Sequence, residues 1–110
     1  MNITRIGLLG EWKAARYLKK QGMRILQKRY RTKHGEIDLI LQDGDTLVFA
    51  EVKYRPSGQM GDGLSTIDTQ KKKRLRYAAG CYLASHPATD VRFDAVEITS
   101  AGLRHIPNAF

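Results

Sequence analysis

The sequence has little cysteine and no long apolar run. Cys81 is the single cysteine among 110 residues, which excludes an intrachain disulfide and a zinc site built from several cysteines. No apolar run approaches the roughly 20 residues that cross a membrane, and the apolar segment 6–10 is too short for a signal-peptide core. We therefore expect a cytoplasmic protein. His34, His86 and His105 lie on different predicted loops or ends without metal-ligand spacing, so we assign them no catalytic role.

The chain also has few acidic residues for its number of basic ones. Eleven Asp and Glu stand against nineteen Lys and Arg, which gives a formal net charge of +8. Such an excess favours a polyanionic partner, and nucleic acid is the first candidate. An anionic membrane surface is the second candidate, but no long amphipathic helix with large apolar anchors accompanies the basic residues. Part of the charge could simply aid solubility.

Length and composition suit one compact domain over residues 1–110. With 42% apolar and 27% charged residues the chain can bury a modest core, and it has no room for a second domain. Apolar periodicity and turn signals predict the order α-β-β-β-α-β-β. The ranges are a helix over 4–21 that ends at Gly22, strands over 23–30, 36–41 and 46–54, a mobile Gly-rich loop over 56–63, a second helix capped by Ser65 or Thr66, and strands over 91–98 and 103–106. The strand-helix-strand passage requires a right-handed crossover, so the sheet is mixed, with one parallel pairing.

The strands at 36–41 and 46–54 form the most informative segment. Asp43-Gly44 between them is a strong signal for a tight hairpin turn, because glycine accepts the positive φ that the turn requires. With these two residues at the centre of the turn, Asp38 should face Phe49 on the other strand. A longer loop with an even residue count keeps each side chain on the same face, whereas an odd count moves Asp38 to the other face.

One face of this hairpin should be apolar and the other partly charged. The apolar face, which a helix must cover, carries Ile37, Leu39, Leu41, Val48, Ala50, Val52 and Tyr54. The other face begins with Ile40, Leu47 and Phe49 and ends with Asp38, Glu36, Glu51 and Lys53. Carboxylates gathered on a half-buried face repel one another and lose hydration, which favours a metal ion or other cation among them. The alternative is a structural salt bridge between Lys53 and Glu51, with Glu36 and Asp38 reaching solvent.

Several motifs extend this pattern over nearly the whole chain. They are Gly10-Glu11 with Ala14 and Leu18, then Gly22, Gly35-Glu36-Ile37-Asp38-Leu39, Phe49-Ala50-Glu51-Val52-Lys53-Tyr54-Arg55, Gly63, Lys72, Ala78-Ala79, Arg92-Phe93-Asp94 and Asn108-Ala109-Phe110. Asp38 followed by Glu51-Val52-Lys53 resembles the D…(D/E)-X-K signature of the PD-(D/E)XK nuclease superfamily. The whole set resembles the YraN-type family of small bacterial proteins. This resemblance implies a restriction-endonuclease-like α/β fold, with a central mixed sheet flanked by helices, near the archaeal Holliday-junction resolvases.

The resemblance further implies an endonuclease for structured or branched DNA that depends on Mg²⁺ or Mn²⁺. Asp38 and Glu51, together with Glu11 from the first helix, would hold the metal, and Lys53 would orient the attacking water or stabilise developing charge. Gln70 matches a glutamine that resolvase-like proteins carry after the E-X-K strand, and Glu36 is a reserve ligand. Glu11 could also be an ordinary early-helix glutamate that the helix dipole favours. A non-catalytic nucleic-acid-binding module on the same fold is the alternative function.

Basic residues near the ends of predicted elements are candidates for phosphate contacts. They are Lys28, Arg29, Arg31 and Lys33 around the end of the first strand, Arg55 after the E-X-K segment, and Lys71, Lys72, Lys73 and Arg74 on the second helix. Tyr30 among them suits base stacking. A charged edge strand and a solvated helix face are the alternatives. We expect DNA rather than RNA as the partner and no membrane; resolvases act as dimers, so a homodimer stays open, although the sequence shows no dimer surface.

Overall fold

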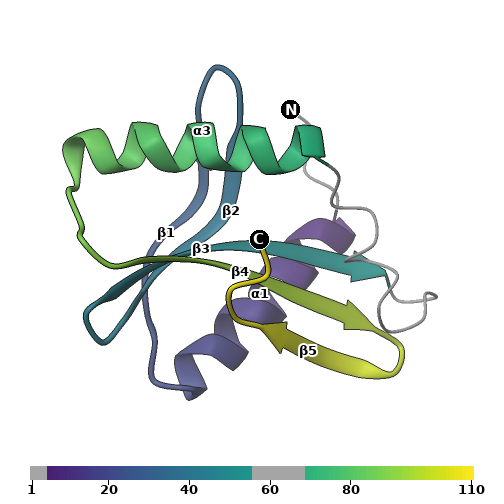
Figure 1. Ribbon diagram of the computed structural model, residues 1–110. Helices are drawn as coiled ribbons and strands as arrows, with labels where there is room; N and C mark the ends of the chain where they lie inside the picture. The colour runs from purple at the N-terminus through teal and green to yellow at the C-terminus, as the bar shows by residue number, and fades with distance from the viewer. Residues whose placement is uncertain (1–4, 56–68) are drawn as a thin grey trace.

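The computed structural model describes residues 5–55 and 69–110, with side chains from residue 8 onward. The elements are α1 (Arg5–Lys20), β1 (Arg24–Arg31), β2 (Glu36–Asp43), β3 (Thr46–Arg55), α3 (Thr69–Ser85), β4 (Val91–Thr99) and β5 (Gly102–Ile106) (Figure 1). The predicted α-β-β-β-α-β-β order is therefore confirmed. The predicted caps at Ser65 and Thr66 and the loop at 56–63 lie outside the described residues.

The strands form one five-stranded mixed sheet in the order β1-β2-β3-β4-β5. Neighbouring strands are antiparallel except β3 and β4, which are parallel, as the crossover requires. This mixed α/β arrangement is consistent with the restriction-endonuclease-like fold. No helix in the described ranges is long and apolar enough to span a membrane.

The two helices cover opposite faces of the sheet (Figure 1). Alternate side chains of a strand point to opposite faces, so β2 and β3 can supply two separate cores. In the first core, Ala14, Ala15 and Leu18 of α1 pack on Leu39, Leu41, Val48, Ala50, Val96 and Ile98. In the second core, Leu75, Ala78, Ala79 and Tyr82 of α3 pack on Ile37, Ile40, Leu47 and Phe49.

The register of the β2–β3 hairpin differs from the prediction by two residues. Ile40 pairs with Phe49, and the turn residues are Gly44 and Asp45 instead of Asp43 and Gly44. Gly44 has a φ of 59°, and a glycine at the first central position of the turn is typical of a type II′ hairpin. Because the shift is even, it leaves the side chains on their expected faces.

Two apolar residues depart from their predicted positions. Ile37 is predicted on the same face as Leu39 and Leu41 but packs on the α3 side. The backbone pairing of β2 with β3 ends at Leu39 and Ala50, and strict alternation does not continue beyond it. Leu9 belongs to the apolar pattern that predicts the helix over 4–21, but it is 43% exposed, since the buried stripe of α1 runs instead through Gly10, Ala14 and Leu18.

A glycine ends α1 as predicted. Gly22 has a φ of 98°, and its N–H donates to the carbonyl of Lys19, while the N–H of Met23 donates to the carbonyl of Leu18. These two hydrogen bonds define a Schellman motif, which satisfies the last carbonyls of a helix. Met23 and Leu18 are both buried in the first core, so the motif also fixes where the chain enters β1.

A second buried group holds the C-terminal residues against β4. The carboxylate of Asp94 is fully buried and accepts hydrogen bonds from Arg92, from Nε2 of His105 and from the backbone N–H of Asn108. The backbone N–H of Ala109 donates to the carbonyl of Phe93. The Arg92-Phe93-Asp94 and Asn108-Ala109-Phe110 motifs are thus parts of one structural unit.

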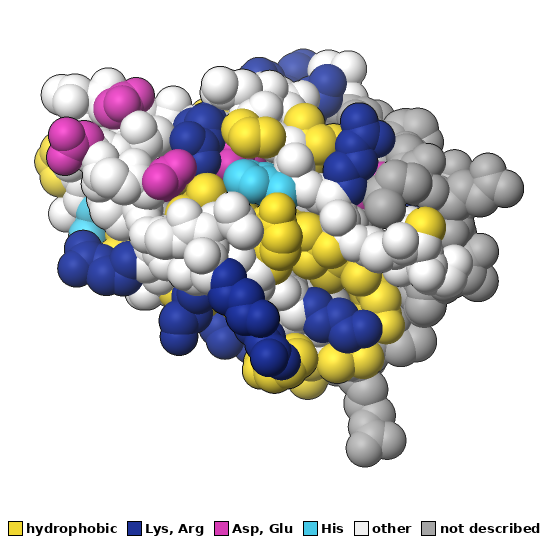
Figure 2. Space-filling view, turned by 90° about the horizontal axis from the view of Figure 1, so that it is seen from below, with side chains coloured by type: hydrophobic (Ala, Val, Ile, Leu, Met, Phe, Trp, Pro, Cys, Tyr) yellow, Lys and Arg dark blue, Asp and Glu magenta, His cyan; other side chains and the backbone are white. Residues whose placement is uncertain are grey.

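Charge is unevenly distributed on the face that Figure 2 shows. Lys and Arg side chains surround a band of hydrophobic side chains, whereas the visible acidic side chains gather towards one end. Basic side chains are thus spread over this face in several separate groups, in keeping with the net charge of +8.

Close backbone approach at Gly35 generates a stability prediction. A Cβ at Gly35 would overlap the backbone carbonyl of Arg74, so Gly35→Ala should lower the free energy of unfolding by about 1–3 kcal/mol. Gly80 lies inside α3 with open space around it, so Gly80→Ala should raise the free energy of unfolding by about 0.5–1 kcal/mol. Urea unfolding of both variants tests the contrast, and effects of the same sign would contradict the close approach.

Candidate functional site

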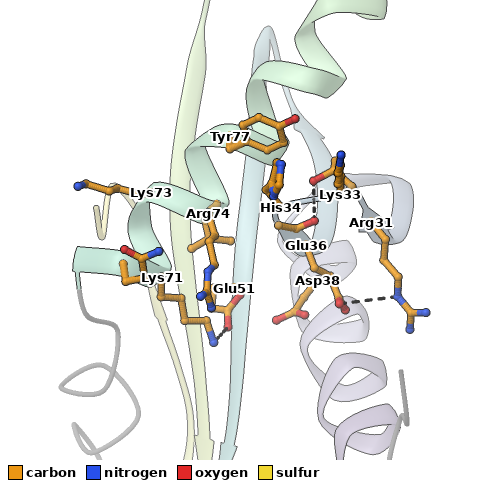
Figure 3. A pocket seen from close by; sticks show the side chains of 14 residues that line it. Arg31, Lys33, His34, Glu36, Asp38, Glu51, Lys71, Lys73, Arg74 and Tyr77 are labelled. Atoms are coloured by element: carbon orange, nitrogen blue, oxygen red, sulfur yellow. Dashed lines mark hydrogen bonds and ion pairs between the residues drawn. The ribbon is translucent and has the colours of Figure 1, made fainter.

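An open groove lies where β2, the β1–β2 connection, β3 and α3 meet (Figure 3). We call it the site groove; its volume is about 1360 Å³. It is lined by Arg31, Thr32, Lys33, His34, Gly35, Glu36, Asp38, Glu51, Gln70, Lys71, Lys73, Arg74, Leu75 and Tyr77. The two carboxylates predicted to lie on one face, Asp38 and Glu51, both belong to this lining.

Asp38 lies where the ladder between β2 and β3 ends. Its Oδ2 accepts a hydrogen bond of 2.8 Å from the backbone N–H of Val52, so a side chain replaces the next backbone partner. Burial raises the pKa of Asp38 well above its ordinary value, and the charge of Glu51 raises it further. The Val52 hydrogen bond acts in the opposite direction but does not outweigh them. Asp38 is therefore a carboxyl group whose ionisation the surrounding protein disfavours.

Glu51 is buried and shared by two lysines. Its Oε1 lies 2.5 Å from Nζ of Lys71 and 3.6 Å from Nζ of Lys53. Burial, and then the hydrogen bond with Lys71, lowers the pKa of Lys53. Burial also acts to lower the pKa of Lys71, but the charge of Glu51, the hydrogen bond with Glu51 and the neighbouring Lys53 and Asp38 together outweigh it, so this pKa is raised. Of the two ammonium groups, Lys71 thus holds its proton more firmly.

Lys71 has a different place from the predicted one. The sequence suggests a phosphate contact on an exposed helix face, whereas the structure brings this side chain across the groove to Glu51 (Figure 3). The salt bridge between Lys53 and Glu51 that the sequence offered as the structural alternative is present beside it. Glu36 approaches Arg31 at 3.7 Å at the edge of the groove.

Glu11 approaches from α1 but is already paired. Its Oε1 lies 2.8 Å from Nε of Arg29, and the backbone of Arg29 has a φ of 50°, which is uncommon for this residue type. Burial raises the pKa of Glu11, and the charge of Arg29 lowers it in part. Both atoms are buried, and neither has a hydrogen-bond partner of good geometry within the described residues. The charge of Glu11 still reaches Asp38, whose pKa it raises.

The carboxylate pair of Asp38 and Glu51 fits a hard divalent cation. Within residues 5–55 and 69–110 no group of three or more His, Cys, Asp or Glu side chains is placed to hold a metal. Mg²⁺, however, is usually bound by one or two carboxylates together with water and substrate phosphate. Burial is the main cause of the raised pKa of Asp38, and the charge of Glu51, which a cation would offset, raises this pKa further. Glu11 is not part of this pair, because it faces Arg29.

The remaining predicted residues divide between the groove and other surfaces. Gln70, Arg31, Lys33, Lys73 and Arg74 line the site groove. Lys28 and Arg29 instead line a second hollow with Leu8, Leu9, Glu11 and Trp12. Lys72 and Arg55 belong to the lining of neither. The ring of Tyr30 packs edge to face on Tyr82, at 5.3 Å between centroids, and does not line the groove.

Three residues near the site were missed by the sequence reasoning. His34 and Tyr77 line the groove, and Glu97 is fully buried in β4 in register with Lys53. Helical spacing could have found Tyr77, which follows Gln70 and Arg74 on one face of α3. Glu97 stands among apolar residues of an alternating strand, which was a signal for a buried acid.

The sheet, the carboxylate pair and the adjacent lysines define the class: a mixed α/β protein consistent with a nuclease-like fold. The chain belongs to the UPF0102 family, the YraN-type family that its motifs resemble. The model of this family, described as "Uncharacterised protein family UPF0102", matches residues 10–98, which include the whole lining of the site groove.

Curated relatives agree with this assignment. A UPF0102 protein of Herminiimonas arsenicoxydans is 40% identical over 105 residues, which cover 94% of this chain and 85% of the relative. One of Dechloromonas aromatica is 40% identical over 107 residues, which cover 97% of this chain and 89% of the relative. One of Pseudomonas putida strain GB-1 is 41% identical over 115 residues, covering 97% and 94%. The similarity therefore extends over almost the full length of both partners in each comparison.

The raised pKa of Asp38 makes stability depend on pH. The folded protein keeps a proton that the unfolded chain loses, so stability falls as pH rises from the ordinary value of 3.8 through the raised pKa. Asp38→Asn removes this titration and keeps an oxygen for the Val52 N–H. In chelator-treated protein, wild type should lose up to about 1.4 kcal/mol per pH unit relative to the variant within that window. Urea unfolding from about pH 4 to pH 8 measures the difference, and a constant difference would contradict it.

Proposed function

We propose that this protein is a metal-dependent endonuclease that hydrolyses phosphodiester bonds in structured or branched DNA. The observation that carries the proposal is the convergence of Asp38, Glu51 and Lys53 in and beside one groove, with Asp38 and Glu51 close enough to raise the pKa of Asp38. Burying two neighbouring carboxylates lowers the stability of the fold, so their retention favours a functional role. The family assignment and the fold are compatible with this activity.

Asp38 and Glu51 would hold Mg²⁺ or Mn²⁺, hard ions that take carboxylate oxygens. Such an ion, held by these two residues, would polarise the scissile phosphate and lower the pKa of a water molecule. Lys53, half-buried beside Glu51, would orient that water or stabilise the negative charge that develops on the phosphate. The Val52 N–H holds the Asp38 carboxylate in place. Lys71 neutralises Glu51 in the ion-free protein and would compete with the ion for it.

Basic side chains along the groove would bind the DNA backbone. Arg31, Lys33, Lys73 and Arg74 all line the groove and are all exposed. We call these four side chains the rim of the groove. They attract phosphates, and their binding releases the counterions condensed on the DNA. The less exposed carboxylates of Asp38 and Glu51, which we call the floor, repel phosphates unless a metal ion neutralises them. In this arrangement the rim would bind the DNA backbone, and the carboxylates of the floor would hold the metal ion for hydrolysis.

A non-catalytic DNA-binding module is the second candidate. One observation favours it: Glu51 is already neutralised by Lys71 and Lys53, so this part of the site is satisfied without a metal ion. In that case the same rim would bind DNA, and the lysines would be structural counter-ions.

Cleavage assays separate the two candidates. With Mg²⁺ or Mn²⁺, wild type should cut four-way junctions, flaps or single strands. Asp38→Asn, Glu51→Gln and Lys53→Met should each lower the rate at least about 100-fold, because each removes a ligand of the ion or a charge at the reacting phosphate. Asp45→Asn is the matched control, since Asp45 is an exposed acid in the β2–β3 turn, and it should cut like wild type.

DNA affinity without metal should survive all four substitutions, since the rim supplies it. If wild type binds these substrates but cuts none of them, or if the three site variants cut as well as wild type, the binding module replaces the nuclease.

The salt dependence of binding locates the phosphate contacts. Replacing Lys73 and Arg74 together by Gln should make the log-log slope of duplex affinity against salt less steep by about 0.9 for each phosphate that the variant no longer neutralises. The control replaces Arg76 and Arg104 by Gln, which removes the same charge from exposed positions outside the groove. Equal flattening by both double variants would show that net charge, and not the groove, determines binding.

A further inference from the structure

One wall of the site groove carries an aromatic pair that the proposed hydrolysis does not use. His34, in the β1–β2 connection, and Tyr77 of α3 meet edge to face, with 5.3 Å between ring centroids and 73° between ring planes (Figure 3). Both side chains are exposed, and 46% of the surface of Tyr77 is accessible. The exposed ring of Tyr77 can therefore offer a stacking surface to a ligand in the groove.

The pair is held in a fixed place relative to the carboxylates. The turn that carries His34 is closed by Thr32, whose N–H and Oγ1 both donate to the carbonyl of Gly35 at 2.8 Å. Gly35 in turn packs directly against the backbone of Arg74, one helical turn before Tyr77. Backbone contact, and not flexible side chains, thus positions the aromatic wall.

The side chains that line the groove are complementary to a strand of nucleotides. Its volume of about 1360 Å³ exceeds the roughly 300–1,000 Å³ of small-molecule pockets, which favours a polymer. Exposed Lys33 and Arg74 flank the aromatic pair and suit phosphates, while the rings suit a base. In a duplex both faces of a base are covered by its neighbours in the stack. Away from the ends of a duplex, only an unpaired base can therefore offer a face to Tyr77.

We propose that Tyr77, supported by His34, is a stacking platform for an unpaired base of DNA in the site groove, so that the groove takes single-stranded segments in preference to duplex. This inference rests on the proposed function only in that DNA binds the groove. It specifies which part of a structured substrate enters: a single strand at a flap or an opened branch point.

Binding measurements without metal test the platform. Tyr77→Ala should weaken binding of a short single-stranded oligonucleotide by about 5- to 150-fold, the range typical for removal of one stacked base. Its effect on a blunt duplex of the same length should be less than about 2-fold. Tyr77→Phe keeps the ring and should bind single strands like wild type. Trp12→Ala is the matched control, because Trp12 is an exposed aromatic on α1 outside the groove, and it should leave both affinities unchanged.

A second readout uses the wild-type protein. A single strand that carries 2-aminopurine should lose fluorescence on binding wild type and Tyr77→Phe, because stacking quenches this base, and should keep it with Tyr77→Ala. If wild type binds single strands but Tyr77→Ala binds them equally well, or loses single strand and duplex alike, the platform is overturned while the proposed function stands. If wild type binds neither form of DNA, the platform and the proposed function fail together.

Discussion

The site depends on the electrostatic repulsion between Asp38 and Glu51, two carboxylates that line the same basic groove. Asp38 and Glu51 can approach because the β2–β3 ladder stops at Leu39 and Ala50, and the Asp38 carboxylate takes the Val52 N–H in place of a backbone carbonyl. Burial and mutual repulsion then raise the pKa of Asp38. Lys53 and Lys71 offset the charge of Glu51 without removing the repulsion. The end of the ladder, the lysine pair and the groove are thus consequences of one electrostatic arrangement.

The fold shows how differently a buried carboxylate can be treated. Asp94 is fully buried, but donors from Arg92, His105 and Asn108 surround it, so its hydrogen-bonding capacity is filled and it anchors the C-terminal residues. Asp38 has one backbone donor and an acidic neighbour. Both motifs stand out in the sequence for the same reason, an acid inside a strand. The hydrogen-bond partners show the difference: the donors around Asp94 satisfy its carboxylate, whereas Asp38 faces the charge of Glu51.

The parts of the site that depend on local pattern could be predicted from the sequence, and those that depend on tertiary packing could not. The predicted faces hold for the paired residues of β2 even though the turn is at Gly44 and Asp45, because an error of two residues conserves parity. Ile37 and Asp38 both lie beyond the end of this ladder: Asp38 still lines the site groove with Glu51, whereas Ile37 packs on the α3 side and not with Leu39 and Leu41. No local sequence pattern shows that the backbone of α3 at Arg74 packs against Gly35.

This packing decides what the helix contributes to the site. The position of α3 brings Lys71 onto Glu51 and Tyr77 beside His34. The sequence instead suggested a uniform charged face for this helix and gave Tyr30 the aromatic role. Tyr30 is taken up by packing on Tyr82, which lies on the buried side of the same helix.

The backbone contact between Gly35 and α3 links several parts of the site. One continuous helix carries Lys71, Lys73, Arg74 and Tyr77, so it supplies the counter-ion of Glu51, the groove cations and the aromatic wall together. A cation that displaced Lys71 from Glu51 and a DNA strand that stacked on Tyr77 would both act on the position of α3. Their binding free energies would then be coupled, and thermodynamic reciprocity requires that each change the affinity for the other by the same factor.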